Sequence, residues 1–263
     1  MAKRNRPSGK NHRIRSPKVG REVPGIHSAK EALKVRPQEV LELLLVQGWE
    51  NHPELSECES LARGHRRPTK VVSASVLDRI CSTHQGVVAR VASSPKFDWP
   101  EELTQEDSAA YGRTYLALDG ITDPQNLGAI MRTAWLMGVQ GVFLPERRAA
   151  HLTPAAIKVA SGGAEHVPVE VVDSLPKALE TLKNKGFWVY GLSAEGAVGL
   201  WQQEFAADSV IVVGAEDRGL RPGVEKICDQ LVSIPQVDVN ASYNASVAAA
   251  LVMAEVTRQR KNR

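Results

Sequence analysis

The chain has 263 residues, of which 43% are hydrophobic and 24% are charged, and its formal net charge at pH 7 is +3. This length and composition allow a proper buried core and two modest domains. No apolar run approaches the length that crosses a bilayer, and no hydrophobic segment follows the basic start, so we expect a cytoplasmic protein that does not enter a membrane. Three scattered cysteines, Cys58, Cys81 and Cys228, predict buried thiols and neither a disulfide framework nor a zinc site.

Positive charge is concentrated at the start of the chain. From Lys3 to Lys18 every charged residue is basic, and Pro, Ser, Gly and Asn fill much of the rest. Residues 1–22 are therefore predicted to form a disordered basic arm. A solubilising tail and a tether to a polyanion such as nucleic acid both remain open on charge alone.

The next stretch, residues 23–95, has the pattern of a small α/β domain. We predict helices over 27–33, 55–62 and 75–80 and strands over 40–46, 70–72 and 86–91. Residues 96–112 are polar, acidic and aperiodic, which is typical of a linker.

Residues 113–263 alternate between short apolar runs and helical patterns, which predicts an α/β domain with a parallel sheet covered by helices on both faces. The predicted strands are 115–118, 141–144, 167–172, 187–192, 210–213 and 231–234, and the predicted helices are 127–137, 154–160, 175–185, 222–228 and a last one from 244 to 256. The last helix is apolar almost all round, so it belongs either to the core or to an interface.

Three polar or glycine-rich segments each come after a predicted strand. They are Asp123-Pro124-Gln125-Asn126-Leu127-Gly128 running to Arg132, Gly214-Ala215-Glu216-Asp217-Arg218-Gly219, and Ser242-Tyr243-Asn244-Ala245-Ser246. Loops that leave the carboxyl ends of strands in an open α/β sheet meet at one crevice, so these segments are expected to form a site.

Common cofactor and hydrolase motifs are absent from the sequence: no Gly-x-Gly-x-x-Gly follows the first strand of either domain, and neither a P-loop nor Gly-x-Ser-x-Gly occurs. Taken singly, Glu216 is consistent with a solvated loop acid and Asn244 with a helix N-cap. Arg132 falls beside the apolar stripe of its helix, where it would reach the rim of the crevice. Its guanidinium suits phosphate or ribose oxygens.

The order and spacing of these segments resemble the SpoU or TrmH family of RNA ribose 2′-O-methyltransferases. The family's first motif corresponds to Asn126-Leu127-Gly128 with Arg132, the second to Gly214-x-Glu216-x-x-Gly219, and the third to Ile234-Pro235 followed by Ser242-x-Asn244-x-Ser246. The resemblance spans residues 114–257. Gly25-Ile26-His27 opens a region that looks like the ribosomal-protein-like RNA-binding domain of the branch that modifies a guanosine of large-subunit ribosomal RNA. Tyr243 and Ala245 depart from the usual Leu and Val, from which we expect a changed pocket wall.

The resemblance implies a SPOUT fold with a deep trefoil knot, which topology rules alone would not have predicted. It also implies a homodimer, with the last helix at its interface, and S-adenosylmethionine as cofactor without a metal. The implied cofactor-binding residues are Ser193, Ala194, Gly214, Ala215, Glu216, Gly219, Ile234, Tyr243 and Asn244, and the implied catalytic residues are Arg132, Asn126, Glu216, Ser242 and Asn244.

The implied reaction is methylation of a ribose 2′-hydroxyl in RNA, in which Arg132 acts on the ribose. A 2′-hydroxyl is a poor nucleophile that must be aligned and deprotonated. Arg132 as a base and Arg132 as a positioning group both remain open, although a guanidinium holds its proton tightly. Two alternatives remain as well: a transfer-RNA ribose methyltransferase, and a catalytically silent RNA-binding protein of the ribosome.

Overall fold

A computed structural model describes residues 20–96, 99, 112–238 and 241–261 of the chain. Most of the predicted basic arm (1–22) and most of the predicted linker (96–112) lie outside the described residues, so both stay predictions. The described residues contain two separate β-sheets, one of four strands and one of seven. The α/β class predicted from the sequence is confirmed for both parts.

The smaller sheet has the strand order β1-β4-β2-β3, in which only β2 and β3 run parallel. Short 3-10 turns at Pro37–Glu39 and Trp49–Asn51 flank β2. The elements are β1 (Arg21–Pro24), α1 (Ile26–Val35), β2 (Val40–Val46), α2 (Pro53–Gly64), β3 (Thr69–Val72), α3 (Ala74–Asp78) and β4 (Val87–Val91).

The larger sheet is parallel throughout and has the order β7-β6-β5-β10-β8-β11-β9. The parallel sheet predicted from the alternating pattern is therefore confirmed. Its elements are β5 (Thr114–Asp119), α4 (Pro124–Leu136), β6 (Gly141–Pro145), α5 (Pro154–Ala160), α6 (Gly163–His166), β7 (Val169–Val172), α7 (Leu175–Asn184), β8 (Trp188–Leu192), β9 (Val198–Gly199), β10 (Ser209–Gly214), α8 (Pro222–Glu225), β11 (Gln230–Ser233) and α9 (Ala245–Lys261).

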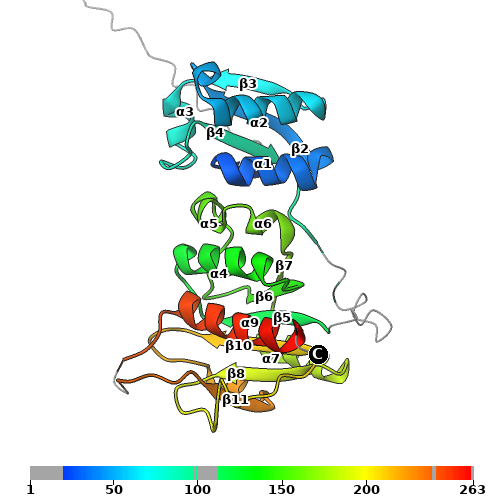
Figure 1. Cartoon of the computed structure of the whole chain (residues 1–263), viewed down its shortest axis with the longest axis vertical. Coiled ribbons are helices and arrows are strands. Elements are labelled where there is room, and N and C mark those ends of the chain that lie inside the picture. The colour runs from blue at the N-terminus through cyan, green and yellow to red at the C-terminus, as the bar shows by residue number, and fades with distance from the viewer. Residues whose placement is uncertain (1–19, 97–98, 100–111, 239–240, 262–263) are drawn as a thin grey trace, which may run out of the picture.

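Helices cover both faces of the larger sheet. Because alternate residues of a strand point to opposite faces, nearly every residue of the central strands β5 and β10 is buried. In β5, Leu116 and Leu118 pack with α4 and α9, whereas Tyr115 and Ala117 pack with α7 and α8. This burial on both faces explains why the sequence of such a strand, for example 115–118, is apolar without interruption. Helix α9 lies across α4 and β10, so one side of it belongs to the core (Figure 1).

Three elements were not predicted from the sequence: β1, α6 and β9. β1 carries Arg21, Glu22 and Pro24 in four residues, and β9 has only two residues, so neither shows a usable period. Helix α6 has four residues and follows Ser161 and Gly162, which both have left-handed φ angles of 49° and 106°. Such a backbone reversal is decided by packing and not by an apolar pattern.

The two sheets are joined by a packed contact between α1 and β1 on one side and α5 and α6 on the other (Figure 1). At its centre the carboxylate of Glu165, whose side chain is fully buried, forms ion pairs with Arg21 and with Arg36, the latter at 2.8 Å. Around them Ser28 Oγ donates to the Ile157 carbonyl at 3.2 Å, and His166 lies 2.8 Å from Glu31.

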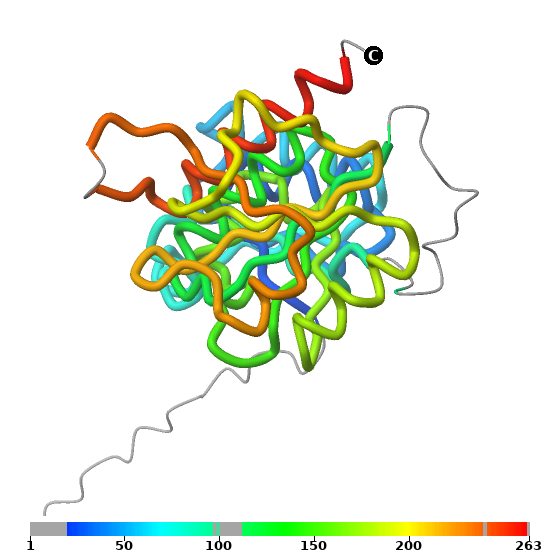
Figure 2. Tube along the Cα trace, turned by 90° about the horizontal axis from the view of Figure 1, so that it is seen from below, coloured from blue at the N-terminus to red at the C-terminus, as the bar shows by residue number. Residues whose placement is uncertain are grey.

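No helix in the described part of the chain is long and apolar enough to span a membrane. The trefoil knot that the resemblance implies stays a prediction, as does the division into domains at residues 95 and 113. Seen along the length of the molecule, the described parts of the segment between β11 and α9 extend away from the body of the protein (Figure 2).

Candidate active site at the carboxyl edge of the parallel sheet

The strand order places the three sequence segments side by side. β10 lies between β5 and β8, and β11 lies on the far side of β8. Because all these strands are parallel, the loops that follow β5, β10, β8 and β11 leave the same edge of the sheet. The crevice expected from the sequence is therefore built from four neighbouring loops.

Glu216 links the three segments by hydrogen bonds. Its Oε1 accepts from Asn126 Nδ2 at 2.9 Å, from Asn244 Nδ2 at 2.6 Å and from the Ala245 backbone N–H at 3.0 Å. Asn244 Nδ2 also lies 2.9 Å from Asn126 Oδ1. Residues that are 90 and 118 positions from Asn126 thus meet at one carboxylate.

Asn244 has a second role at the start of α9. Its Oδ1 accepts from the Ser246 backbone N–H at 3.0 Å and from Ser246 Oγ at 2.6 Å, which is the hydrogen bonding of an N-cap. The negative charge of Glu216 beside Ala245 N–H also favours the positive end of the helix. The N-cap function considered from the sequence is therefore confirmed for Asn244, which also contacts Glu216 and Asn126.

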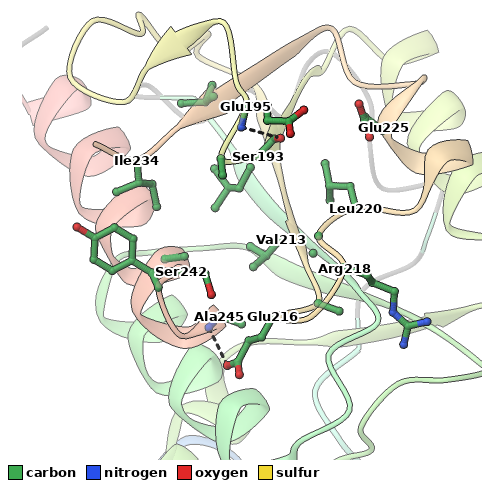
Figure 3. A pocket seen from close by; sticks show the side chains of 18 of the residues that line it. Ser193, Glu195, Val213, Glu216, Arg218, Leu220, Glu225, Ile234, Ser242 and Ala245 are labelled. Carbon is green, nitrogen blue, oxygen red and sulfur yellow. Dashed lines mark hydrogen bonds between the residues drawn. The ribbon is translucent and has the colours of Figure 1, made fainter. Parts of the chain in front are cut away.

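A cavity of about 370 Å³ opens beside Glu216 (Figure 3). Eight of the nine residues expected to bind a cofactor line it, and the ninth, Asn244, does not. Its walls combine apolar side chains with a polar rim, as ligand sites usually do. The apolar walls are Leu192, Val213, Leu220, Val232 and Ile234, and the polar rim includes Ser193, Glu195, Gln236 and Ser242.

Two glycines shape the loop that lines this cavity. A Cβ on Gly214 would lie 2.3 Å from the carbonyl carbon of Gly219, so the loop closes only if residue 214 is glycine. Gly219 has a left-handed φ of 64°, and the loop is fastened by reciprocal backbone hydrogen bonds of 3.1 and 2.8 Å between Ala215 and Gly219. The glycine spacing of the second segment is explained by this tight turn.

The third motif glycine, Gly128, serves packing. A Cβ there would lie 2.5 Å from the carbonyl oxygen of Ala156, so glycine allows α4 to approach α5 closely. Asp123 caps α4, accepting from the Gln125 backbone N–H at 2.9 Å, and this fixes the direction in which Asn126 leaves the helix start.

A second cavity of about 240 Å³ adjoins the first on the side of β5. It is lined by the loop that follows β5, from Gly120 to Asp123, together with Asn126 and residues 215–218. Glu216 and Arg218 line both cavities, so the Glu216 carboxylate forms part of the boundary between them. Two neighbouring hollows of this kind suit a reaction between two molecules.

Arg132 does not line either cavity. Its side chain is exposed on α4 and forms no hydrogen bond or ion pair with another described residue. Helix geometry places it roughly 120° around and about 9 Å along α4 from Asn126. Ser242 lines the larger cavity, and Tyr243 does too, where its hydroxyl donates to the Pro235 carbonyl at 3.1 Å.

Sequence reasoning missed several residues of this edge. Arg218 lies within the second motif and lines both cavities, although its side chain points away from the larger one in Figure 3. Asp119, 1% exposed at the end of β5, accepts from the Arg221 backbone N–H at 2.8 Å and from Arg221 Nε at 2.5 Å. An acidic residue that ends a buried strand is the signal that would have found Asp119.

No group of three His, Cys, Asp or Glu residues among the described residues is placed to hold a metal ion. Burial raises the pKa of the Cys228 thiol to about 12 and that of Cys58 to about 11, so neither is a thiolate at neutral pH.

Comparison with known proteins identifies the class to which this fold and site belong. Residues 113–254 match the model of the SpoU rRNA Methylase family, and residues 23–97 match the model described as RNA 2′-O ribose methyltransferase substrate binding. The chain belongs to the SpoU rRNA methylase family, as the motif spacing predicted.

Individual relatives are similar to this protein along nearly the whole length of both chains. The chain is 37% identical to the 23S rRNA (guanosine-2′-O-)-methyltransferase RlmB of Pseudomonas syringae pv. tomato over 90% of this chain and 95% of the relative. It is 36% identical to a putative TrmH family tRNA/rRNA methyltransferase of Staphylococcus saprophyticus, over 90% and 95%. Among solved structures, the SpoU methyltransferase AviRb of Streptomyces viridochromogenes in complex with AdoMet has the same fold, with a TM-score of 0.76, 24% identity and coverage of 91% and 90%.

Proposed function

We propose that this protein methylates a ribose 2′-hydroxyl in RNA, using S-adenosylmethionine as the methyl donor. The observation that carries the proposal is the Glu216 junction, which ties three family motifs together beside two adjoining cavities. The relatives named for methylation of a guanosine in 23S rRNA support large-subunit ribosomal RNA as the substrate.

The larger cavity is the proposed cofactor site. Its apolar walls, Leu192, Val213 and Leu220 among them, suit an adenine ring, and the polar groups of Ser193, Glu195 and Gln236 suit a ribose and an amino acid. Bound there, S-adenosylmethionine supplies an electrophilic methyl group. The tight Ala215–Gly219 turn would place backbone atoms against the ligand. It depends on Gly214, where a Cβ would meet the Gly219 backbone, and on Gly219, which has a left-handed φ.

The smaller cavity is the proposed place of the target ribose. Asn126 and Glu216 line it and are held in place by Asn244, so they would orient the nucleotide without large movement. We propose that Ser242, on the wall of the cofactor site, and Asn244 order the boundary between the two ligands. Arg132 is the proposed group that positions the ribose and favours removal of its proton through the neighbouring phosphate.

We further propose a homodimer located in the cytoplasm. The support for a second copy is exposed apolar surface around the segment that leads into α9, where Val237 is fully exposed and Tyr243 and Val247 are 38% and 45% exposed. These residues lie close together in the sequence, and exposed apolar surface of this kind is typical of an association surface.

The decisive experiment identifies the methylated product. The purified protein is incubated with labelled S-adenosylmethionine and either unmodified large-subunit ribosomal RNA or transfer RNA, with and without chelator. We expect label in an alkali-resistant dinucleotide from ribosomal RNA, at an unchanged rate in chelator. Label on a base, label only on transfer RNA, or no label at all would each overturn a stated part of the proposal.

Arg132 is tested by Arg132→Ala. We expect turnover to fall by about 10²-fold or more while S-adenosylmethionine affinity stays near that of the wild type. Near-normal turnover would make Arg132 an ordinary exposed residue of α4. Mixing Arg132→Ala with Glu216→Ala then locates its action: recovered activity in the mixture means that Arg132 serves the site of the partner subunit.

A further inference from the structure

The carboxyl edge of the larger sheet has a third hollow, on the side away from the proposed cofactor site. Its volume is about 360 Å³, and it lies between the loop after β6 and the start of α7. Three arginines contribute to its lining, against a single carboxylate, that of Asp173. The remaining lining residues are Pro145, Ser174, Leu175 and Pro176.

Two of these arginines have side chains that are available to a ligand. Arg147 and Arg148 are both exposed, and neither forms a hydrogen bond or ion pair with another residue in the part of the chain that the structure describes. The third, Arg221, uses Nε for Asp119 and is fixed by that contact, while its side chain remains 38% exposed. One anchored guanidinium and two uncommitted ones therefore share one hollow.

The backbone around Arg148 is unusual. Its φ is +60°, in the left-handed region that residues other than Gly, Asn and Asp rarely adopt. Strained residues of this kind cluster at ligand clamps and similar sites. The turn is fastened by a hydrogen bond of 2.7 Å from the Ala150 backbone N–H to the Ile121 carbonyl.

Helix α7 adds a further positive contribution. Its first residues, Leu175 and Pro176, and its N-cap Ser174 line the hollow, so the positive end of a ten-residue helix faces the same space as the arginines. The hollow is therefore suited to an anion. The arginine side chains make the larger contribution, and the positive end of α7 makes a smaller one.

The hollow adjoins the proposed ribose cavity through two contacts. Ala150, two residues after Arg148, is bonded to Ile121, which lines that cavity. Arg221 is bonded to Asp119, which directly precedes the cavity residue Gly120. The order along the sheet edge is thus arginine hollow after β6 and β7, ribose cavity after β5, and cofactor cavity after β10, β8 and β11.

We propose that the hollow formed by Arg147, Arg148 and Arg221 binds a backbone phosphate of the substrate RNA, next to the nucleotide that is methylated. The inference rests on the proposed function, because it takes the β5 cavity as the place of the ribose. Guanidinium forks match phosphate oxygens and form charge-assisted hydrogen bonds. Such a contact fixes the register of the strand without reading its sequence.

The test uses the full-length double variant Arg147→Ala/Arg148→Gly. Glycine at position 148 fits the left-handed φ, so the variant removes two cations without adding backbone strain. The matched control, Lys185→Ala/Lys226→Ala, removes the same charge from residues past the opposite end of α7 and past α8. Dissociation constants for unmodified large-subunit ribosomal RNA are measured between 50 and about 200 mM KCl, the range over which phosphate contacts lose strength.

We expect the double variant to bind RNA roughly 10-fold or more weakly at low salt, as loss of a charge-assisted contact predicts. The slope of log affinity against log salt should become shallower by about 1, the amount for one lost phosphate contact. S-adenosylmethionine affinity should stay unchanged, and the control should bind RNA like the wild type. Equal losses in variant and control would overturn the inference, as would an unchanged slope.

A second measurement locates the phosphate. RNA fragments with a single neutral methylphosphonate at each position around the methylated nucleotide are compared on wild type and variant. At one position, the neutral methylphosphonate should weaken binding to the wild type but cause no further loss of affinity for the variant. Equal, additive losses at every position would refute the phosphate site, whereas the proposed function fails only if no ribose 2′-O-methyl product forms.

Discussion

Glu216 and Glu165 each hold together segments that lie far apart in the sequence, but they do so in opposite surroundings. Glu216 is exposed and accepts neutral amide donors from Asn126, Asn244 and the start of α9. Glu165 is buried and is paired with two cations, Arg21 and Arg36, at the contact between the two sheets.

This difference in burial indicates that Glu165 serves the stability of the fold, whereas Glu216 is free to serve the site. At Glu165, the Oε1 oxygen is buried without a hydrogen-bond partner among the described residues, and burial lowers the pKa of Arg21 against the opposing effect of Glu165. A buried ionic joint of this kind tolerates little rearrangement, since each charge depends on the others. The carboxylate of Glu216 and the amide of Asn244 are exposed to water, so they can exchange partners at small cost.

The largest expected effect is on stability at the buried joint. Glu165→Ala leaves two partly buried arginines uncompensated, and breaking a buried ion pair in this way costs about 3–5 kcal/mol. Urea unfolding should show the loss, while the exposed control Glu180→Ala should change the unfolding free energy by less than about 0.5 kcal/mol. Both variants are compared at one protein concentration.

The triple variant Arg21→Met/Arg36→Met/Glu165→Leu sharpens this test. Replacing all three charges by apolar groups should recover most of the lost free energy, because no unpaired charge then remains. If Glu165→Ala unfolds like the wild type, the two sheets do not depend on this joint. In that case the remaining contacts, such as Ser28 with Ile157, would be sufficient to hold the joint, and the contrast with Glu216 would disappear.

The next effect is on turnover at the exposed junction. Glu216→Ala removes the acceptor shared by three segments, and small misplacements of reacting groups cost about 10²-fold in rate. Stability should fall by only about 1 kcal/mol, since the freed donors can bind water. Initial rates and urea unfolding are measured on the same preparation, with Glu180→Ala as control. A stability loss as large as that of Glu165→Ala would show that both glutamates serve architecture.

The same contrast explains what the sequence could reveal. The Glu216 junction was within reach because its partners lie in strand-end loops with fixed spacing, and the parallel strands that carry them are apolar runs. The Glu165 joint was not, because Arg21 lies on the four-residue strand β1, which shows no period, and Arg36 follows α1 outside any recognisable motif. The apolar stripe of α4 predicted on which side of the helix Arg132 lies, but it could not predict that Arg132 lines neither cavity.

A third carboxylate extends the comparison to the opposite edge of the sheet. Asp208, just before β10, accepts from the Arg113 backbone N–H at 2.9 Å, from Nε at 3.2 Å and from a terminal guanidinium nitrogen at 2.6 Å. It therefore ties the starts of β10 and β5 together, as Glu216 ties the loops that follow their ends. Arg113 is almost completely buried and also lies over the ring of Phe187, 4.6 Å from its centre.

The smallest expected effect is the pH dependence of this pair. Burial of Asp208 opposes its ionisation, but hydrogen bonds from the Arg113 side chain and backbone outweigh burial and lower the pKa of the carboxyl. A carboxyl with a lowered folded-state pKa stabilises the protein above its unfolded value of about 3.9, and this stabilisation is lost as pH falls through the folded-state pKa. Asp208→Asn should therefore be less stable than wild type at pH 6, and the difference should shrink below about pH 4. Urea midpoints measured from pH 6 to 3 check this expectation, and a constant difference across that range would mean that the Asp208 charge does not stabilise the edge.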